Sequence, residues 1–147
     1  MKITWLSIII LLNTFVLCAQ EEKKWVADLL DAQASAWNEG DINRFMATYW
    51  RSEELQFVGE GGLVNGWEAT LKRYQTRYPD RATMGTLKFD LLDVQRRSKK
   101  VLSAVGQYYL TRPQVGDLRG FFTLILVKIN GQWLIVSDTT VASPQRN

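Results

Sequence analysis

The sequence contains no histidine and a single cysteine, Cys18. The absence of histidine excludes Ser-His-Asp triads, Cys-His pairs and His-ligated metal sites. One cysteine cannot form an intrachain disulfide, so the fold depends on its hydrophobic core. Only 3 prolines and 10 glycines occur in 147 residues, which argues against a low-complexity linker. Without histidine and with one cysteine the sequence offers no soft-metal site, and we expect neither a metal nor a cofactor.

The charges are spread along the chain and do not form a basic arm. Lysine and arginine number 18 and aspartate and glutamate 15, which gives a net charge of +3. Nucleic acid is therefore not an expected partner. The chain is 46% hydrophobic and 12% aromatic, which is typical of one globular domain.

The N-terminal segment predicts export. Lys2 is followed by an uncharged, mainly apolar segment, Ile3–Gln20, which is typical of a secretory signal. Cleavage after Ala19 would remove residues 1–19 and leave a single domain, residues 20–147, in the periplasm or medium and free of the membrane. Two alternatives stay open: a lipoprotein acylated at Cys18, or a retained membrane anchor, because the uncharged segment is just long enough to span a bilayer.

Apolar spacing predicts three helices before the sheet. The first covers Glu22–Asn38, and the second follows Asp41, whose side chain can cap it, and carries its apolar face to Trp50. The third covers Trp67–Tyr78 and is stopped by Pro79. These helices precede most of the predicted strands, which indicates an α+β fold.

Strand signals surround a glycine-rich turn and then dominate the end of the chain. Gly59-Glu60-Gly61-Gly62 predicts a turn between two short strands; it lacks the spacing and the lysine of a phosphate-binding loop. After Pro79 only sheet is expected, with short connections that favour an antiparallel meander. The four long strands are predicted at Leu87–Leu91, Val101–Leu110, Phe121–Ile129 and Trp133–Val141.

Three stretches carry a resemblance to a known family. They are the break between the first two helices, Ala36–Asp41; Gly66 with the helix that ends at Tyr78-Pro79; and the final strand, Gly131–Asp138. Together, and in this order, they resemble the nuclear transport factor two-like superfamily, also called SnoaL-like or ketosteroid-isomerase-like. The nearest branch is one of small exported bacterial proteins of unassigned function. The resemblance covers residues 20–147.

The resemblance implies a cone-shaped fold with an apolar cavity. In that family a curved antiparallel sheet wraps three N-terminal helices in the order α-α-β-β-α-β-β-β-β. Relatives isomerise steroids, cyclise polyketides or dehydrate small phenolics, whereas others transport, dimerise or bind proteins, so the fold does not determine the function. Members of the branch often carry an Asp-His pair in the last strand, where this chain has Asp138 followed by Thr139.

Asp138 is the candidate catalytic residue. Strand alternation predicts that it shares a face with three neighbours, namely Leu134, Val136 and Thr140. If that face lines the cavity, burial would raise the pKa of the carboxyl group, as a general acid or base requires. The alternative is that Asp138 meets water or pairs with Arg73.

An aromatic set forms the candidate ligand-binding site. Aromatic residues at helical spacing usually form core, and that interpretation stays open for each of them. The predicted ligand-binding residues are Trp37, Tyr49, Trp50, Phe57, Trp67, Tyr74, Tyr78 and Thr140.

Three functions remain open from the sequence. The first is a module that binds a small apolar or aromatic molecule in the cone. The second is an isomerase, cyclase or dehydratase that uses a carboxylate and a tyrosine, and the third is a dimerisation or protein-interaction domain. We also expect a homodimer formed through the outer sheet face, because strand Phe121–Ile129 is apolar on both faces.

Overall fold

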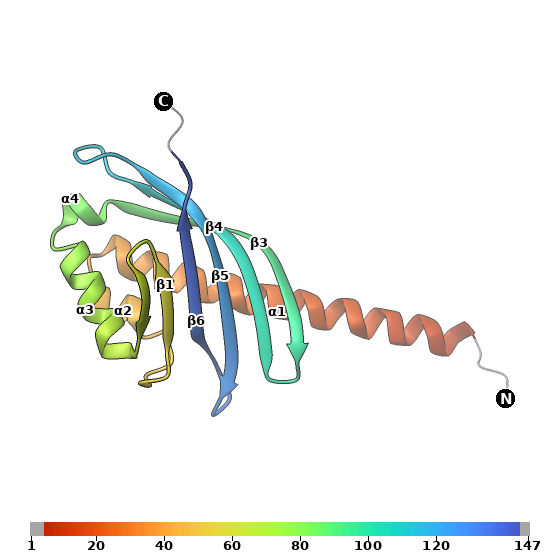
Figure 1. Cartoon of the computed structure of the whole chain (residues 1–147). Coiled ribbons are helices and arrows are strands. Elements are labelled where there is room, and N and C mark those ends of the chain that lie inside the picture. Colours follow the sequence, from red (N-terminus) through yellow and green to blue (C-terminus); the bar gives the residue numbers. More distant parts are fainter. Residues whose placement is uncertain (1–4, 145–147) are drawn as a thin grey trace.

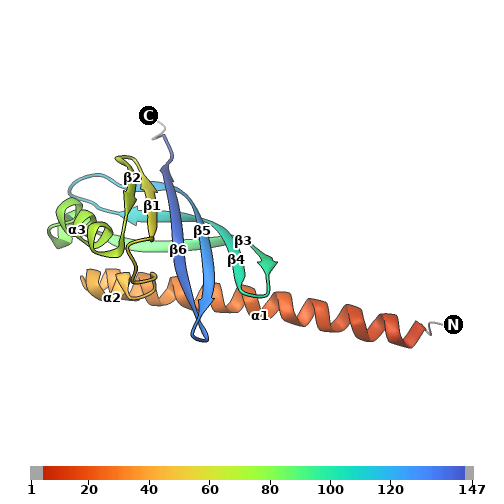
Figure 2. The ribbon, with the colours of Figure 1, turned by 60° about the horizontal axis from the view of Figure 1, so that its bottom comes forward.

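The structure, a computed structural model, describes residues 5–144, and the side chains of residues 20–144. Within that part, helices precede most of a curved sheet and pack on its concave side, as expected for an α+β fold (Figures 1 and 2). The helices are α1 (Trp5–Asn38), α2 (Ile42–Met46), α3 (Trp67–Arg77) and α4 (Arg81–Met84). The strands are β1 (Gln56–Gly59), β2 (Gly62–Asn65), β3 (Thr86–Ser98), β4 (Val101–Thr111), β5 (Leu118–Ile129) and β6 (Gln132–Ala142).

The sheet is mixed rather than wholly antiparallel. Its order is β2-β1-β6-β5-β4-β3, and β3 to β6 form the predicted antiparallel meander. β1, however, pairs with β6 in parallel, with Phe57 opposite Asp138. Alternation along a strand shows which residues share a face, but it does not give the relative direction of two strands that lie far apart in the sequence.

α2 is shorter than predicted. α2 begins after the predicted cap, since the Asp41 carboxylate accepts a hydrogen bond from the Arg44 amide at 2.8 Å. It ends at Met46 rather than Trp50, because the Trp50 amide donates to the Ile135 carbonyl at 2.8 Å and joins the chain to β6.

α4 lies in a region where only sheet was expected. Asp80 and Thr83 form a capping box, in which the Asp80 carboxylate accepts from the Thr83 amide at 2.8 Å. One helical turn is too short to show apolar periodicity, and its only signal was this pair of polar residues.

α1 runs from Trp5, so its backbone continues through most of the predicted signal segment, and its first turns project past the sheet (Figures 1 and 2). Residues 1–4 and the side chain of Cys18 lie outside the description. Among the residues described, no helix is long and apolar enough to cross a membrane.

Hydrogen bonds fix the C-terminal end of α1 against the sheet and α4. The Trp37 indole donates to the Met84 carbonyl at 3.0 Å, and Arg81 donates to the Trp37 carbonyl at 2.8 Å. The Asn38 side chain donates to the Leu87 carbonyl at 3.0 Å and accepts from the Leu87 amide at 2.7 Å. These bonds hold the buried Trp37 ring in place on the concave side of the sheet.

A β-bulge in β6 changes which residues face the interior. Ile125 pairs with Ser137, but the next residue, Leu126, pairs with Ile135, so Val136 is an extra residue on β6. Asp138 therefore shares its face with the fully buried Ile135, and the prediction that it shares a face with Leu134 and Val136 is wrong. Thr140 lies on the same face as Asp138, as predicted, because no irregularity separates them.

Candidate functional site

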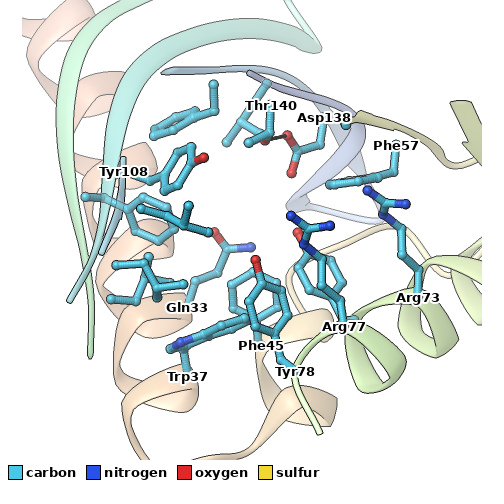
Figure 3. A pocket seen from close by; sticks show the side chains of 18 of the residues that line it. Gln33, Trp37, Phe45, Phe57, Arg73, Arg77, Tyr78, Tyr108, Asp138 and Thr140 are labelled. Carbon is cyan, nitrogen blue, oxygen red and sulfur yellow. Dashed lines mark hydrogen bonds between the residues drawn. The ribbon is translucent and has the colours of Figure 1, made fainter. Parts of the chain in front are cut away.

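A cavity of about 160 Å³ lies between the concave face of the sheet and the helices. Figure 3 shows its side chains converging from α1, α3 and the strands. Seven of the predicted site residues line it, namely Trp37, Tyr49, Phe57, Tyr74, Tyr78, Asp138 and Thr140.

Trp50 and Trp67 are not among the lining residues of this cavity, contrary to the prediction. The Trp67 indole donates to the Met46 carbonyl at 2.9 Å, and the guanidinium of Arg51 lies 4.6 Å from the centre of its ring. Trp67 begins α3, so its side chain joins that helix to α2 and lies beyond the cavity. Helical spacing identified the apolar stripe but not where along it the cavity begins.

The aromatic wall is held by ring contacts. Trp37 packs edge-on against Phe45, with ring centres 5.2 Å apart, and against Tyr78 at 4.8 Å. Tyr74 packs edge-on against Phe45 at 5.1 Å and against Phe57 at 5.5 Å. Rings that contact several others in this geometry have little freedom to fill the space beside them. These contacts therefore hold the wall in place.

Asp138 is the buried acid of the cavity, with 4% of its surface exposed. One carboxyl oxygen accepts from the Tyr49 hydroxyl at 2.7 Å. The other accepts from the Thr140 hydroxyl at 2.8 Å (Figure 3). Burial raises the pKa of Asp138 to about 6, and these two hydrogen bonds offset only part of that effect. The group can therefore hold or release a proton close to neutral pH.

The tyrosines near Asp138 stay protonated. Burial and the charge of Asp138 raise the pKa of Tyr49 and that of Tyr74 well above the ordinary value. Each hydroxyl is thus a hydrogen-bond donor throughout the physiological range. Arg73, the alternative partner, does not pair with Asp138; its guanidinium lies 5.2 Å from the centre of the Phe57 ring.

Gln33 is a cavity residue that the sequence interpretation missed. Only 2% of it is exposed, and its amide donates to the Thr48 hydroxyl at 2.8 Å. Val26, Leu30, Gln33 and Trp37 follow helical spacing, so a polar residue within that apolar stripe was the available signal.

The mouth of the cavity carries polar residues that were also missed. Arg77 of α3 pairs with Glu60 of the β1–β2 turn at 2.6 Å, and Tyr108 of β4 contributes its ring. Burial raises the pKa of the Tyr108 hydroxyl, and its charged neighbours include Arg77 and Glu60. These residues come from elements far apart in the sequence, and only the curvature of the sheet brings them together.

Comparison with known proteins gives the family. No family model matches the chain, and no curated protein matches it. Among solved structures, a nuclear transport factor 2 (NTF2)-like protein of unknown function from Shewanella oneidensis is 35% identical, over 80% of this chain and 97% of that one, with a TM-score of 0.76. The chain therefore belongs to the NTF2-like superfamily.

More distant structures share the fold alone. A ketosteroid isomerase-like protein from Erwinia carotovora atroseptica is 18% identical over 84% of this chain and 98% of that one, with a TM-score of 0.68. An NTF2-like superfamily protein from Salmonella enterica is 14% identical over 87% and 95%, with a TM-score of 0.65.

Asp138 predicts a pH-dependent stability. Its pKa is about 6 in the folded protein and about 3.9 in an unfolded chain, so the unfolded chain releases the proton first as pH rises. The free energy of unfolding therefore falls between pH 4 and pH 6 and stays lower above that range. Asp138→Asn has no carboxyl group to ionise and so lacks this loss of stability. The free energy of unfolding of the variant minus that of wild type should therefore increase by about 2–3 kcal/mol from pH 4 to pH 8.

Urea unfolding of both proteins at pH 4 and pH 8 measures that difference. Asp90→Asn is the control, because this carboxylate lies on the exposed side and pairs with Lys88. A difference for Asp138→Asn that does not change with pH would contradict the raised pKa.

Proposed function

We propose that this domain binds a small aromatic or apolar molecule in its cavity. The observation that carries the proposal is a cavity of about 160 Å³ beside a wall of mutually packed aromatic rings. An apolar protein cavity of roughly 150 Å³ is large enough for benzene. The site is thus matched to one aromatic ring with small substituents.

Polar groups within the lining would orient such a molecule. Asp138 can accept or, when protonated, donate a hydrogen bond, and Gln33 presents an amide from the opposite side, on α1 (Figure 3). A mainly apolar lining with a few convergent polar groups is the usual composition of a small-molecule site.

Neutral one-ring compounds should bind wild-type protein, and a side chain at the entrance should block them. The probes are p-cresol and acetophenone, followed by isothermal titration calorimetry. Ala142 lines the cavity from the exposed end of β6, so Ala142→Phe narrows the entrance without entering the core. We expect this variant to reduce affinity at least about tenfold, since the ring occupies space the probe needs.

Ala69→Phe is the matched control. Ala69 is exposed on α3 and does not line the cavity, so the same substitution there should leave binding unchanged. Failure of every neutral probe to bind folded wild-type protein, or equal effects of the two variants, would contradict the proposal.

Asp138 favours a second candidate function, proton transfer at a carbon next to a carbonyl group. A buried carboxyl group with a pKa of about 6 can accept a proton from the substrate at neutral pH. The O–H of Tyr49 is used by Asp138, so the donor to the substrate would be the protonated hydroxyl of Tyr74, which also lines the cavity. An isomerase, cyclase or dehydratase requires such a base and such a donor. Carboxylate and tyrosine side chains supply both without histidine.

Deuterium exchange tests this second function directly. Acetophenone carries exchangeable hydrogens next to its carbonyl group, and proton NMR in D₂O follows their loss. Wild-type protein should accelerate the exchange, and Asp138→Asn should lower the rate by about 10²–10⁴-fold while keeping affinity for the neutral probe. Binding of acetophenone without accelerated exchange would leave the domain as a binding module.

We also propose that a second copy covers the outer sheet face. Phe121 and Val141 are opposite each other on β5 and β6 and are 46% and 62% exposed, and the exposed Val105 lies on the neighbouring strand. Apolar residues gathered on one face of a soluble domain support an isologous dimer.

Light scattering at micromolar concentration should give a dimer for wild-type protein. Phe121→Lys should shift it to monomer, because two charges would meet across the symmetry axis, whereas Leu63→Lys, at the exposed β2 edge, should not. A monomeric wild type would contradict this proposal.

Export remains part of the proposed biology. The sequence of residues 1–19 supports it, and so does the projection of the first turns of α1 beyond the sheet (Figure 2). After cleavage the helix would begin at Gln20 with Glu21 and Glu22, acidic residues that stabilise a helix N-terminus. Glu22 is buried and pairs with Arg96 of β3, so the shortened helix would still be tied to the sheet.

A further inference from the structure

Arg73 is a cation at the mouth of the cavity, and no carboxylate within the described part of the chain pairs with it. Arg73 and Arg77 lie one helical turn apart on α3, and both line the cavity (Figure 3). Arg77 is paired with Glu60. Among the described residues Arg73 forms no ion pair, and its charge rests against the face of Phe57 at 5.2 Å.

The β1–β2 turn leaves space for this guanidinium. A Cβ atom on Gly61 would lie 2.7 Å from Nη1 of Arg73, and one on Gly59 would lie 3.0 Å from Nη2. Neither glycine has a positive φ, so the backbone does not require glycine at these positions. Their common effect is a gap in which the Arg73 side chain sits.

A partly buried guanidinium binds one kind of ligand group especially well. Its planar fork of N–H donors matches the two oxygens of a carboxylate, and such a pair is stronger than a hydrogen bond between neutral groups. The Phe57 ring covers the flat face of the guanidinium and leaves its N–H groups, which point outward in the plane, able to bind a ligand.

The charges of the site also fix an orientation. Asp138 lies in the wall of the cavity, where its ionised form repels a second carboxylate, and Glu60 at the mouth is already paired with Arg77. An acidic ligand would thus place its carboxylate at Arg73 and its apolar part against the aromatic wall.

Resting on the proposed function, we propose that the ligand is an aromatic monocarboxylic acid whose carboxylate is bound by Arg73. The ring occupies the cavity, and the chain between ring and carboxylate spans the distance to the mouth. Arg73 is then the residue that selects acids over neutral molecules of the same shape.

Pairs of acids and amides test this selection. The probes are benzoate, phenylacetate and 3-phenylpropionate, each with its primary amide, which has nearly the same shape and no charge. Wild-type protein should bind the best-fitting acid about tenfold more tightly than its amide, as expected for a charge-assisted pair near the surface. Arg73→Met should remove that preference and leave the affinity for the amide within about twofold.

Two further variants separate charge from packing. Gly61→Ala keeps the arginine but forces its guanidinium to move, and it should reduce the preference for the acid. Lys72→Met removes the same charge from the adjacent, exposed position, which does not line the cavity, and should leave the preference unchanged. Circular dichroism and thermal unfolding verify that each variant is folded.

The outcomes distinguish this inference from the proposed function. If p-cresol or acetophenone binds but no acid is preferred over its amide, the inference is overturned and the proposed function stands. A preference that survives Arg73→Met, or an equal loss of acid and amide in that variant, overturns the inference as well. If no aromatic probe binds at all, both fail together.

Discussion

The hydrogen bond between Tyr49 and Asp138 joins the parts of the chain that form the cavity. Tyr49 belongs to the segment that follows α2. Asp138 lies on β6 opposite Phe57 of β1, where the short hairpin of β1 and β2 meets the long meander. A buried carboxylate is costly unless its oxygens are hydrogen-bonded. The Tyr49 and Thr140 hydroxyls meet that need, and the remaining cost appears as a pKa of about 6.

The cavity stays open because the aromatic rings around it pack against one another. Trp37 is fixed at one end by its indole hydrogen bond to Met84 and along its edges by Phe45 and Tyr78. Aliphatic side chains would adjust to close such a space, whereas rings held edge to face would lose several contacts by moving into it. The same contacts that pack the helices against one another therefore keep the space beside them open.

The sequence predicted the class of fold and seven of the residues that line the cavity, and each failure has a physical cause. Periodicity placed the first three helices and the meander, because each buries one face, but it missed the single turn of α4. The prediction that Asp138 and Thr140 share a face was correct, whereas the prediction that Asp138 and Val136 share a face was wrong. A single bulged residue inverts the alternation of side chains along a strand, and the amino-acid composition does not reveal it. Trp67 met the helical pattern but lies beyond the cavity, whereas Gln33 interrupted the pattern and lines it. Here the polar residue that interrupts the apolar stripe lines the cavity.

The polarity of the site changes from its mouth to its interior, and this gradient links the two proposed functions. Arg73, beside the Arg77–Glu60 ion pair, makes the mouth cationic. The rings make the middle apolar, and Asp138 supplies a titratable group in the wall. A molecule held by an anionic end at the mouth would have its opposite part directed inward with little orientational freedom. Restricted orientation of this kind is what converts a bound molecule into a substrate when a base lies beside it. Binding and proton transfer would then use the same pose, and they differ only in whether the bound molecule presents an acidic C–H bond to Asp138.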